Sequence, residues 1–202
     1  MESPSHSVRG GKVEGGSQKR ARNSSKWIII ELCAGIMIGS FVCEEILKLD
    51  IAATFFSEIE EDAIWVATAL FPDAQSLGPV ETITKDTVRN ILRKFPGCKV
   101  LILGGPPCQD VSFLNASHKG AFGNKSSFRI YFKQVFDMFL EMLPGLVFGL
   151  MECTRVEPQD RVEYDSVFGF APFEVCSASW QHITRPRWWW FIVRREIQAR
   201  LG

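Results

Sequence analysis

The chain has 202 residues, of which 46% are hydrophobic, and its 23 Lys and Arg side chains balance 23 Asp and Glu side chains. This length suits one globular domain with a substantial core and is short for two. The longest apolar runs fall far short of the roughly 20 residues that span a bilayer, and no apolar secretory segment opens the chain. We therefore expect an intracellular protein without a membrane partner.

Charge is distributed unevenly along the chain. Residues 1–26 carry six basic and two acidic side chains among Gly and Ser, which leaves 17 basic against 21 acidic side chains in residues 27–202. The first segment buries too little apolar surface to fold, so its composition predicts a disordered basic tail. Within it, Lys19-Arg20-Ala21-Arg22 is either a nuclear localisation signal or a solvated basic cluster. The acidic balance of the remainder is unusual for a protein that binds nucleic acid.

The cysteines form no Cys-x-x-Cys pair and no set with histidine at zinc-finger spacing. Isolated thiols of an intracellular protein are kept reduced. The sequence therefore predicts neither a metal site nor a disulfide framework. The cysteines are Cys33, Cys43, Cys98, Cys108, Cys153 and Cys176.

From residue 27 onward, short apolar runs alternate with longer amphipathic ones, which is typical of βαβ units around a mainly parallel sheet. We expect strands near residues 27–32, 52–57, 75–78, 99–104, 146–152, 173–179 and 188–194. We expect helices near residues 40–49, 60–70, 84–95 and 128–143. Aromatic residues recur every three or four positions in the last helix, which indicates core packing. The pattern predicts one α/β domain over residues 27–202, with a seven-stranded sheet flanked by helices.

Small and acidic residues follow the first two predicted strands. Gly35 and Gly39 lie in a turn that opens onto a helix, where a ligand can approach the backbone closely and the helix terminus favours an anion. A plain tight turn is the alternative. Glu58 ends the second strand, and a carboxylate at that position of a dinucleotide-binding sheet accepts the hydroxyls of a ribose. It could equally begin the next helix as a solvated residue.

The most informative run is Leu103–Ser112, which contains Pro107-Cys108-Gln109 just after the strand at 99–104. Its glycines and prolines predict a rigid loop that presents the Cys108 thiol at the carboxyl end of the strand, where open α/β sheets bind ligands. A thiolate at that place is a competent nucleophile once its surroundings lower its pKa. Taken alone, the cysteine could also be a small buried apolar residue.

Two further charged groups lie at strand ends. Glu152 directly follows an apolar strand, so partial desolvation should raise its pKa and suit it to donate a hydrogen bond to a ring nitrogen. A structural ion pair is the alternative. Arg185 and Arg187 precede the last strand, and extended backbone would place both guanidinium groups on one face. They would hold a phosphate or a carbonyl oxygen, or else form surface charge.

Taken in order, the glycine turn, Glu58, the Pro-Pro-Cys-Gln loop, Glu152 and the Arg-x-Arg pair resemble the DNA (cytosine-5) methyltransferases over about residues 27–194. The resemblance implies a Rossmann-like, S-adenosylmethionine-dependent methyltransferase fold. Two short segments look most similar to the de novo class of that family. They are His118-Lys119-Gly120 and Arg129-Ile130-Tyr131-Phe132.

The resemblance also implies the chemistry. Cys108 would add to C6 of a flipped cytosine in DNA while Glu152 hydrogen-bonds N3, so that C5 takes the methyl group of S-adenosylmethionine. Arg187, with Arg185 as its partner, would steady the base and its backbone. The residues expected to line the cofactor are Gly35, Ile36, Glu58, Ile59 and Pro107.

The chain also departs from the family pattern. Cys33, Pro79 and Cys153 stand where the family usually has phenylalanine, aspartate and asparagine, and only 15 residues follow Arg187, without the target-recognition region. Two alternatives therefore stay open. One is a catalytically impaired or regulatory homologue that binds a protein partner, which would supply target recognition. The other is a tRNA cytosine-5 methyltransferase. The DNA substrate implies a location in the nucleus.

Overall fold

The computed structural model describes residues 26–106, 127–169, 171–179 and 182–193. Of the predicted basic tail only Lys26 is described, and the predicted site residues Pro107 and Cys108 lie outside the described residues. The strands are β1 Trp27–Leu32, β2 Ile51–Ser57, β3 Gln75–Ser76, β4 Lys99–Gly104, β5 Val147–Thr154, β6 Phe173–Cys176 and β7 Pro186–Ile192. They form a seven-stranded sheet in the described part of the chain, as the sequence predicts.

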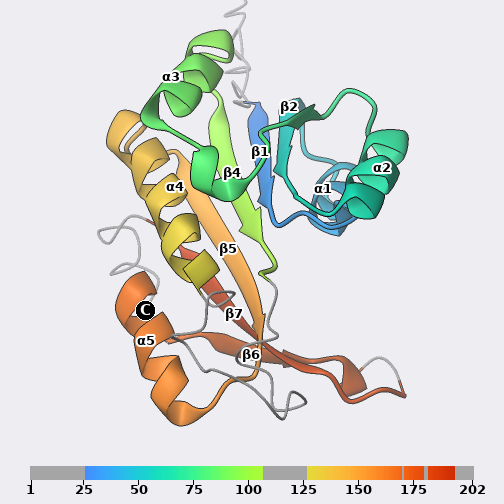
Figure 1. Cartoon of the computed structure of the whole chain (residues 1–202), viewed down its shortest axis with the longest axis vertical. Helices are drawn as coiled ribbons and strands as arrows, with labels where there is room; N and C mark the ends of the chain where they lie inside the picture. The colour runs from blue at the N-terminus through green and yellow to red at the C-terminus, as the bar shows by residue number, and fades with distance from the viewer. Residues whose placement is uncertain (1–25, 107–126, 170, 180–181, 194–202) are drawn as a thin grey trace, which may run out of the picture.

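Helices connect successive strands and cover both faces of this sheet (Figure 1). They are α1 Ile38–Phe41, the π-helical η1 Val42–Ile46, α2 Glu61–Leu70, the short η2 Val80–Thr82, α3 Lys85–Lys94, α4 Phe128–Met142, α5 Pro158–Phe168 and the short η5 Ser177–Ser179. The helices α3, α4 and α5 lie on one face, and α1 and α2 lie on the other (Figure 1). None of the helices described is both long and apolar enough to cross a membrane.

The strand order places the functional ends together. The order across the sheet is β3-β2-β1-β4-β5-β7-β6, and the neighbouring strands from β3 to β5 are parallel. Their carboxyl ends therefore share one edge, which we call the carboxyl edge. Strand β7 is antiparallel to β5, with Thr154 opposite Arg187. The beginning of β7 thus meets the end of β5 at the carboxyl edge.

The main core lies between the sheet and the face formed by α3, α4 and α5. The aromatic stripe of α4 packs into it, which confirms the core role predicted from its spacing; its buried members include Phe128, Phe132, Phe136 and Phe139. Gly104 fits under this helix, because a Cβ atom at that position would lie 2.6 Å from Cδ2 of Phe132. The chain thus uses a glycine to bring the end of β4 close to α4.

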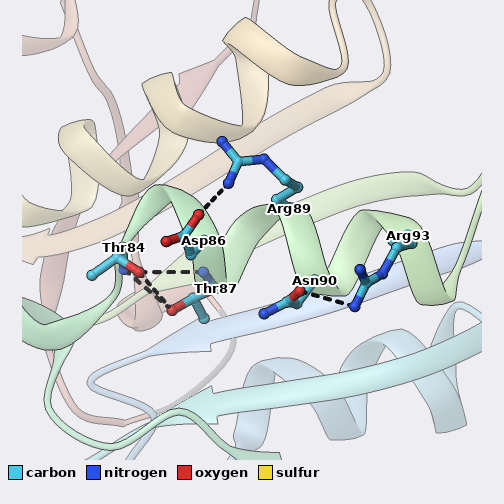
Figure 2. A network of polar contacts seen from close by, with 6 residues as sticks. All are labelled: Thr84, Asp86, Thr87, Arg89, Asn90 and Arg93. Atoms are coloured by element: carbon cyan, nitrogen blue, oxygen red, sulfur yellow. Dashed lines mark hydrogen bonds and ion pairs between the residues drawn. The ribbon is translucent and has the colours of Figure 1, made fainter.

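Helix α3 shows why the predicted helix at 84–95 begins where it does. Thr84 Oγ1 accepts a hydrogen bond from the backbone N–H of Thr87 at 3.2 Å, and Thr87 Oγ1 accepts one from Thr84 N at 3.3 Å (Figure 2). This reciprocal capping box satisfies two otherwise unpaired donors. Along the exposed face, Arg89 pairs with Asp86 (Figure 2).

Several elements differ from the sequence prediction; the strand expected at 75–78, for example, ends at Ser76. The helix expected at 40–49 begins at Ile38 and becomes π-helical from Val42 onward. Helix α5 was not predicted, although a proline at its start and the left-handed Gly169 at its end are ordinary helix boundaries. The strand expected at 173–179 stops at Cys176, where η5 begins.

Candidate active site

Glu58, at the end of β2, reaches the turn that follows β1. Its Oε2 accepts a hydrogen bond from the backbone N–H of Gly35 at 2.8 Å, while its Oε1 accepts from the N–H groups of Ile59 and Glu60 at 2.7 and 3.1 Å. Two residues predicted to bind one cofactor from different strands are therefore in direct contact. The bonds hold the carboxylate in a fixed orientation at the carboxyl edge.

Gly35 leaves room beside this carboxylate. Its φ is +53°, a conformation that favours glycine, and among the described residues beyond its chain neighbours no atom lies within 4 Å of where a Cβ would be. The adjacent side chains of Ile36 and Ile59 are 44% and 65% exposed. An open backbone, a fixed carboxylate and exposed apolar side chains suit a ligand that has both hydroxyls and an apolar ring.

Glu31 is a site residue that the sequence analysis did not identify. This buried carboxylate at the end of β1 accepts hydrogen bonds from Gly39 N at 3.0 Å, Ser40 N at 2.8 Å and Ser40 Oγ at 2.6 Å. Burial raises the pKa of Glu31, and the bonds from Ser40 and Gly39 partly offset that rise. Glu31 thus fixes the start of α1 and, with it, the glycine turn. A lone acidic residue in the apolar run Trp27–Leu32 was the signal for it.

Cys33 lies in the same turn with a φ of +49°. Burial, together with the negative charges of Glu58 and Glu81, raises the pKa of its thiol to about 12. The thiol is therefore protonated at neutral pH, which excludes it as a nucleophile in this environment. It acts as a small apolar surface next to Glu58.

Glu152 and Arg187 meet at the other half of the carboxyl edge. Nε of Arg187 lies 2.7 Å from Oε1 of Glu152, and both side chains are largely shielded from solvent. Burial raises the pKa of Glu152, against the lowering effect of Arg187 and then of Arg185. Both sequence-based interpretations thus apply to Glu152: it is desolvated and it is ion-paired.

The segment after β4 passes beside this pair. A Cβ atom at Gly105 would lie 3.8 Å from Oε2 of Glu152, whose other oxygen is held by Arg187. Cys108 follows three residues later in the sequence, outside the described residues. Strands β2 and β5 are three strand spacings apart, or about 14 Å. Glu58 and Glu152 therefore lie on the same edge of the sheet, at a separation that a cofactor and a substrate base could span together.

Neither models of protein families nor curated protein sequences match the chain. Solved structures do resemble it. A candidate DNA modification methyltransferase encoded within an E. coli prophage has a TM-score of 0.60 and 17% identity, over 86% of this chain and 48% of that chain. The Entamoeba histolytica methyltransferase EhMeth has a TM-score of 0.59 and 16% sequence identity, and the match covers 83% of this chain and 52% of EhMeth. The S. pombe Dnmt2 methyltransferase has a TM-score of 0.52 and 14% sequence identity, and the match covers 81% of this chain and 48% of Dnmt2.

This chain has a Rossmann-like methyltransferase fold. The seven-stranded sheet, with its antiparallel β7, accounts for the similarity. The identities are low, so the likeness concerns the fold and not the substrate. The chain spans about half the length of these three structures. The methyltransferase fold was predicted from the resemblance of the sequence motifs and is confirmed.

Proposed function

We propose that this chain is an S-adenosylmethionine-dependent methyltransferase that acts on C5 of cytosine in DNA and is most similar to the de novo class. The observation that carries the proposal is the Glu152–Arg187 pair beside Gly105, three residues before Cys108. A desolvated acid, a cation and a cysteine loop at the carboxyl edge suit covalent catalysis on an electron-poor ring.

The cofactor would lie against the glycine turn. Gly35 offers an open backbone, Glu58 a fixed carboxylate for the two ribose hydroxyls, and Ile36 and Ile59 apolar surface for the adenine. Pro107 would border the reactive end. When bound there, S-adenosylmethionine supplies an electrophilic methyl group.

The chain's own residues would activate the base. The thiolate of Cys108 forms a bond to C6 of a flipped cytosine, and Glu152 donates a hydrogen bond to N3. The raised pKa of Glu152 favours the protonated form that this bond needs. Arg187 holds Oε1 of Glu152 and so directs the other oxygen toward Gly105, while Arg185 adds positive charge at the rim. After methylation, loss of the C5 proton and breakage of the C–S bond release the product.

DNA is the substrate that the motif resemblance favours, and it implies a location in the nucleus. The E. coli neighbour is described as a DNA modification enzyme, which supports this choice. A protein partner would supply target recognition. Transfer to RNA is the second candidate, since the Pro-Pro-Cys-Gln loop also fits the tRNA cytosine-5 methyltransferases.

The test is transfer of a labelled methyl group from S-adenosylmethionine to duplex DNA and to tRNA in parallel. We expect incorporation into DNA that is lost in Cys108→Ser and kept in the control Cys98→Ala, whose cysteine precedes β4 at the opposite end of the strand. Incorporation into tRNA alone would assign the RNA substrate. Equal incorporation by the parent and Cys108→Ser would overturn the covalent mechanism. Cofactor binding without incorporation on either substrate would favour the regulatory homologue.

A further inference from the structure

Strand β2 has an open edge along its first half. Strand β3 pairs with it only at Phe55 and Phe56, so among the described strands residues 51–54 have β1 on one side and none on the other. The carbonyl of Phe56 points toward β3, where it accepts a hydrogen bond from Leu77 N at 2.7 Å. Because alternate residues of a strand direct their backbone groups to the same side, Thr54 presents its N–H and C=O to the open edge.

A cavity of about 340 Å³ lies on this edge. It is formed by residues 51–54 of β2 and 70–75 after α2, together with Glu44 and Phe95. We call it the β2-edge groove. Its volume is at the lower end of the range for ligand sites. An unpaired strand edge within a cavity offers a template on which an extended peptide can add as a further strand.

The groove has a negative lining. Glu44 and Asp73 contribute carboxylates, and none of the described residues that line the cavity is Lys, Arg or His. Within the described part of the chain, neither carboxylate forms an ion pair, whereas the neighbouring Glu45 is paired with Lys48 at 2.7 Å. Two uncompensated carboxylates beside free backbone groups favour a ligand with a positive charge.

The β2-edge groove is separate from the candidate active site. Glu58 follows Thr54 by four residues of extended chain, so the two residues are about 13 Å apart along the strand direction. The groove lies along the first half of β2, while the cofactor residues follow its last residue. A ligand in the groove would therefore leave the carboxyl edge accessible.

We propose that the β2-edge groove binds an extended segment of a partner protein that carries a Lys or Arg side chain. The backbone of the segment pairs with Thr54 as a strand added beside β2, and its cationic side chain lies near Glu44 and Asp73. This assignment is independent of the proposed catalytic activity. It gives the chain a protein-binding site along residues 51–54 of β2, away from the carboxyl edge.

The test is an NMR titration of the full chain, followed through its backbone amide signals. The probe is the synthetic peptide Lys-Val-Thr-Val-Lys, acetylated and amidated at its ends, at millimolar concentration. We expect shifts confined to the residues that line the groove, which are Glu44, residues 51–54 and 70–75, and Phe95. A peptide with N-methylated central amides should bind at least tenfold more weakly, because it cannot pair as a strand. A peptide with Glu in place of Lys should not bind.

Protein variants test the charge. Combined Glu44→Gln and Asp73→Asn should weaken binding of the Lys peptide by about threefold or more, in keeping with exposed ion pairs. Glu45→Gln is the matched control, because Glu45 is outside the groove lining, and it should leave the affinity unchanged. Neither change removes a buried side chain, so both variants should fold.

Several results would overturn the proposal. They are an absence of shifts at millimolar peptide, equal binding of the N-methylated peptide, and shifts that instead cluster at the carboxyl edge. Movement of the same amide signals on removal of residues 1–25, without peptide, would assign the groove to the chain's own amino terminus. Movement that depends on protein concentration alone would assign it to a second copy.

Discussion

The backbone N–H of Gly35 lies 2.8 Å from Oε2 of Glu58, so one hydrogen bond joins the turn after β1 to the end of β2. The contact orients the carboxylate while the missing side chain of Gly35 keeps the adjacent space open. The two residues form one unit of the proposed cofactor site. A change to either should therefore alter binding more than it alters folding.

Glu58→Gln should weaken binding of S-adenosylmethionine. The amide keeps one oxygen acceptor but loses the charge, and it cannot hold Gly35 and Ile59 while also accepting two ribose hydroxyls. We expect roughly tenfold or greater loss of affinity by isothermal titration calorimetry, the scale of a hydrogen bond to a charged group. Glu61→Gln is the control, since Glu61 is exposed in the first turn of α2. Equal affinities for Glu58→Gln and the parent would contradict the assigned role.

Arg187→Gln should change both the rate and the pH profile of methyl transfer. Arg187 lowers the pKa of Glu152 against the larger effect of burial, so its removal lets that pKa rise further. The protonated acid then persists to higher pH, and the alkaline limb of the rate profile should move upward. We expect at least a tenfold lower rate, because the variant no longer orients Glu152. A slower enzyme with an unmoved alkaline limb would exclude the electrostatic link.

Glu152 should also make stability depend on pH. Burial raises its pKa above the ordinary value of 4.5, so the folded protein keeps this proton to higher pH than the unfolded chain does. Its contribution to stability is full below about pH 4.5 and is lost as the pH rises through the folded pKa. Glu152→Gln cannot ionise and avoids that loss.

Urea denaturation of parent and Glu152→Gln at several pH values measures this effect. The free energy of unfolding of the variant minus that of the parent should increase as the pH rises from about 4.5 through the pKa of Glu152 in the folded protein. Glu31, whose pKa burial also raises, is present in both proteins and cancels in the difference. A difference that does not change with pH would refute the prediction.

Gly104→Ala should destabilise the fold. The new Cβ would lie 2.6 Å from Cδ2 of Phe132, whose ring is fully buried. We expect a loss of about 1–3 kcal/mol in the free energy of unfolding, the usual cost of overpacking a core. Gly105→Ala is a matched control for stability, because among the described residues the nearest atom to its Cβ would be Oε2 of Glu152, at 3.8 Å. Similar stabilities for the two variants would show that α4 adjusts more easily than its packing indicates.

The Cys33 thiol should react slowly with alkylating reagents. Its pKa of about 12 means that little thiolate exists at neutral pH. We expect modification by iodoacetamide to be at least tenfold slower than that of free cysteine, measured by mass spectrometry of the Cys33 peptide. Replacing Glu58 by Gln removes one neighbouring negative charge and should speed the reaction. Alkylation at the rate of free cysteine would rule out the raised pKa.

The sequence predicted the sheet and most of its strands because apolar runs and their alternation with amphipathic segments report burial directly. It also predicted that Glu58, Glu152 and Arg187 lie at strand ends. The pairing of Glu152 with Arg187 could not be predicted by spacing, since it depends on β7 running antiparallel to β5. The roles proposed for Cys108 and Pro107 stay predictions.

Glu31 was missed for a related reason. An acidic residue within an apolar strand breaks the hydrophobic pattern, and its partners, Gly39 and Ser40, become neighbours only once the turn has formed. The start of α1 depends on the same bonds. Local composition therefore predicted most of the elements, although not α5, while contacts across turns determined where α1 begins.

The position of β7 has a consequence for how the protein is made. Strand β7 lies between β5 and β6 but follows both in the sequence, so during synthesis on the ribosome β6 has no partner strand until β7 emerges. Glu152 likewise lacks Arg187 until that moment. Among the described strands, β7 is therefore the one whose emergence joins β6 to the sheet and completes the acid–cation pair in one event, so a nascent chain that stalls before β7 has neither.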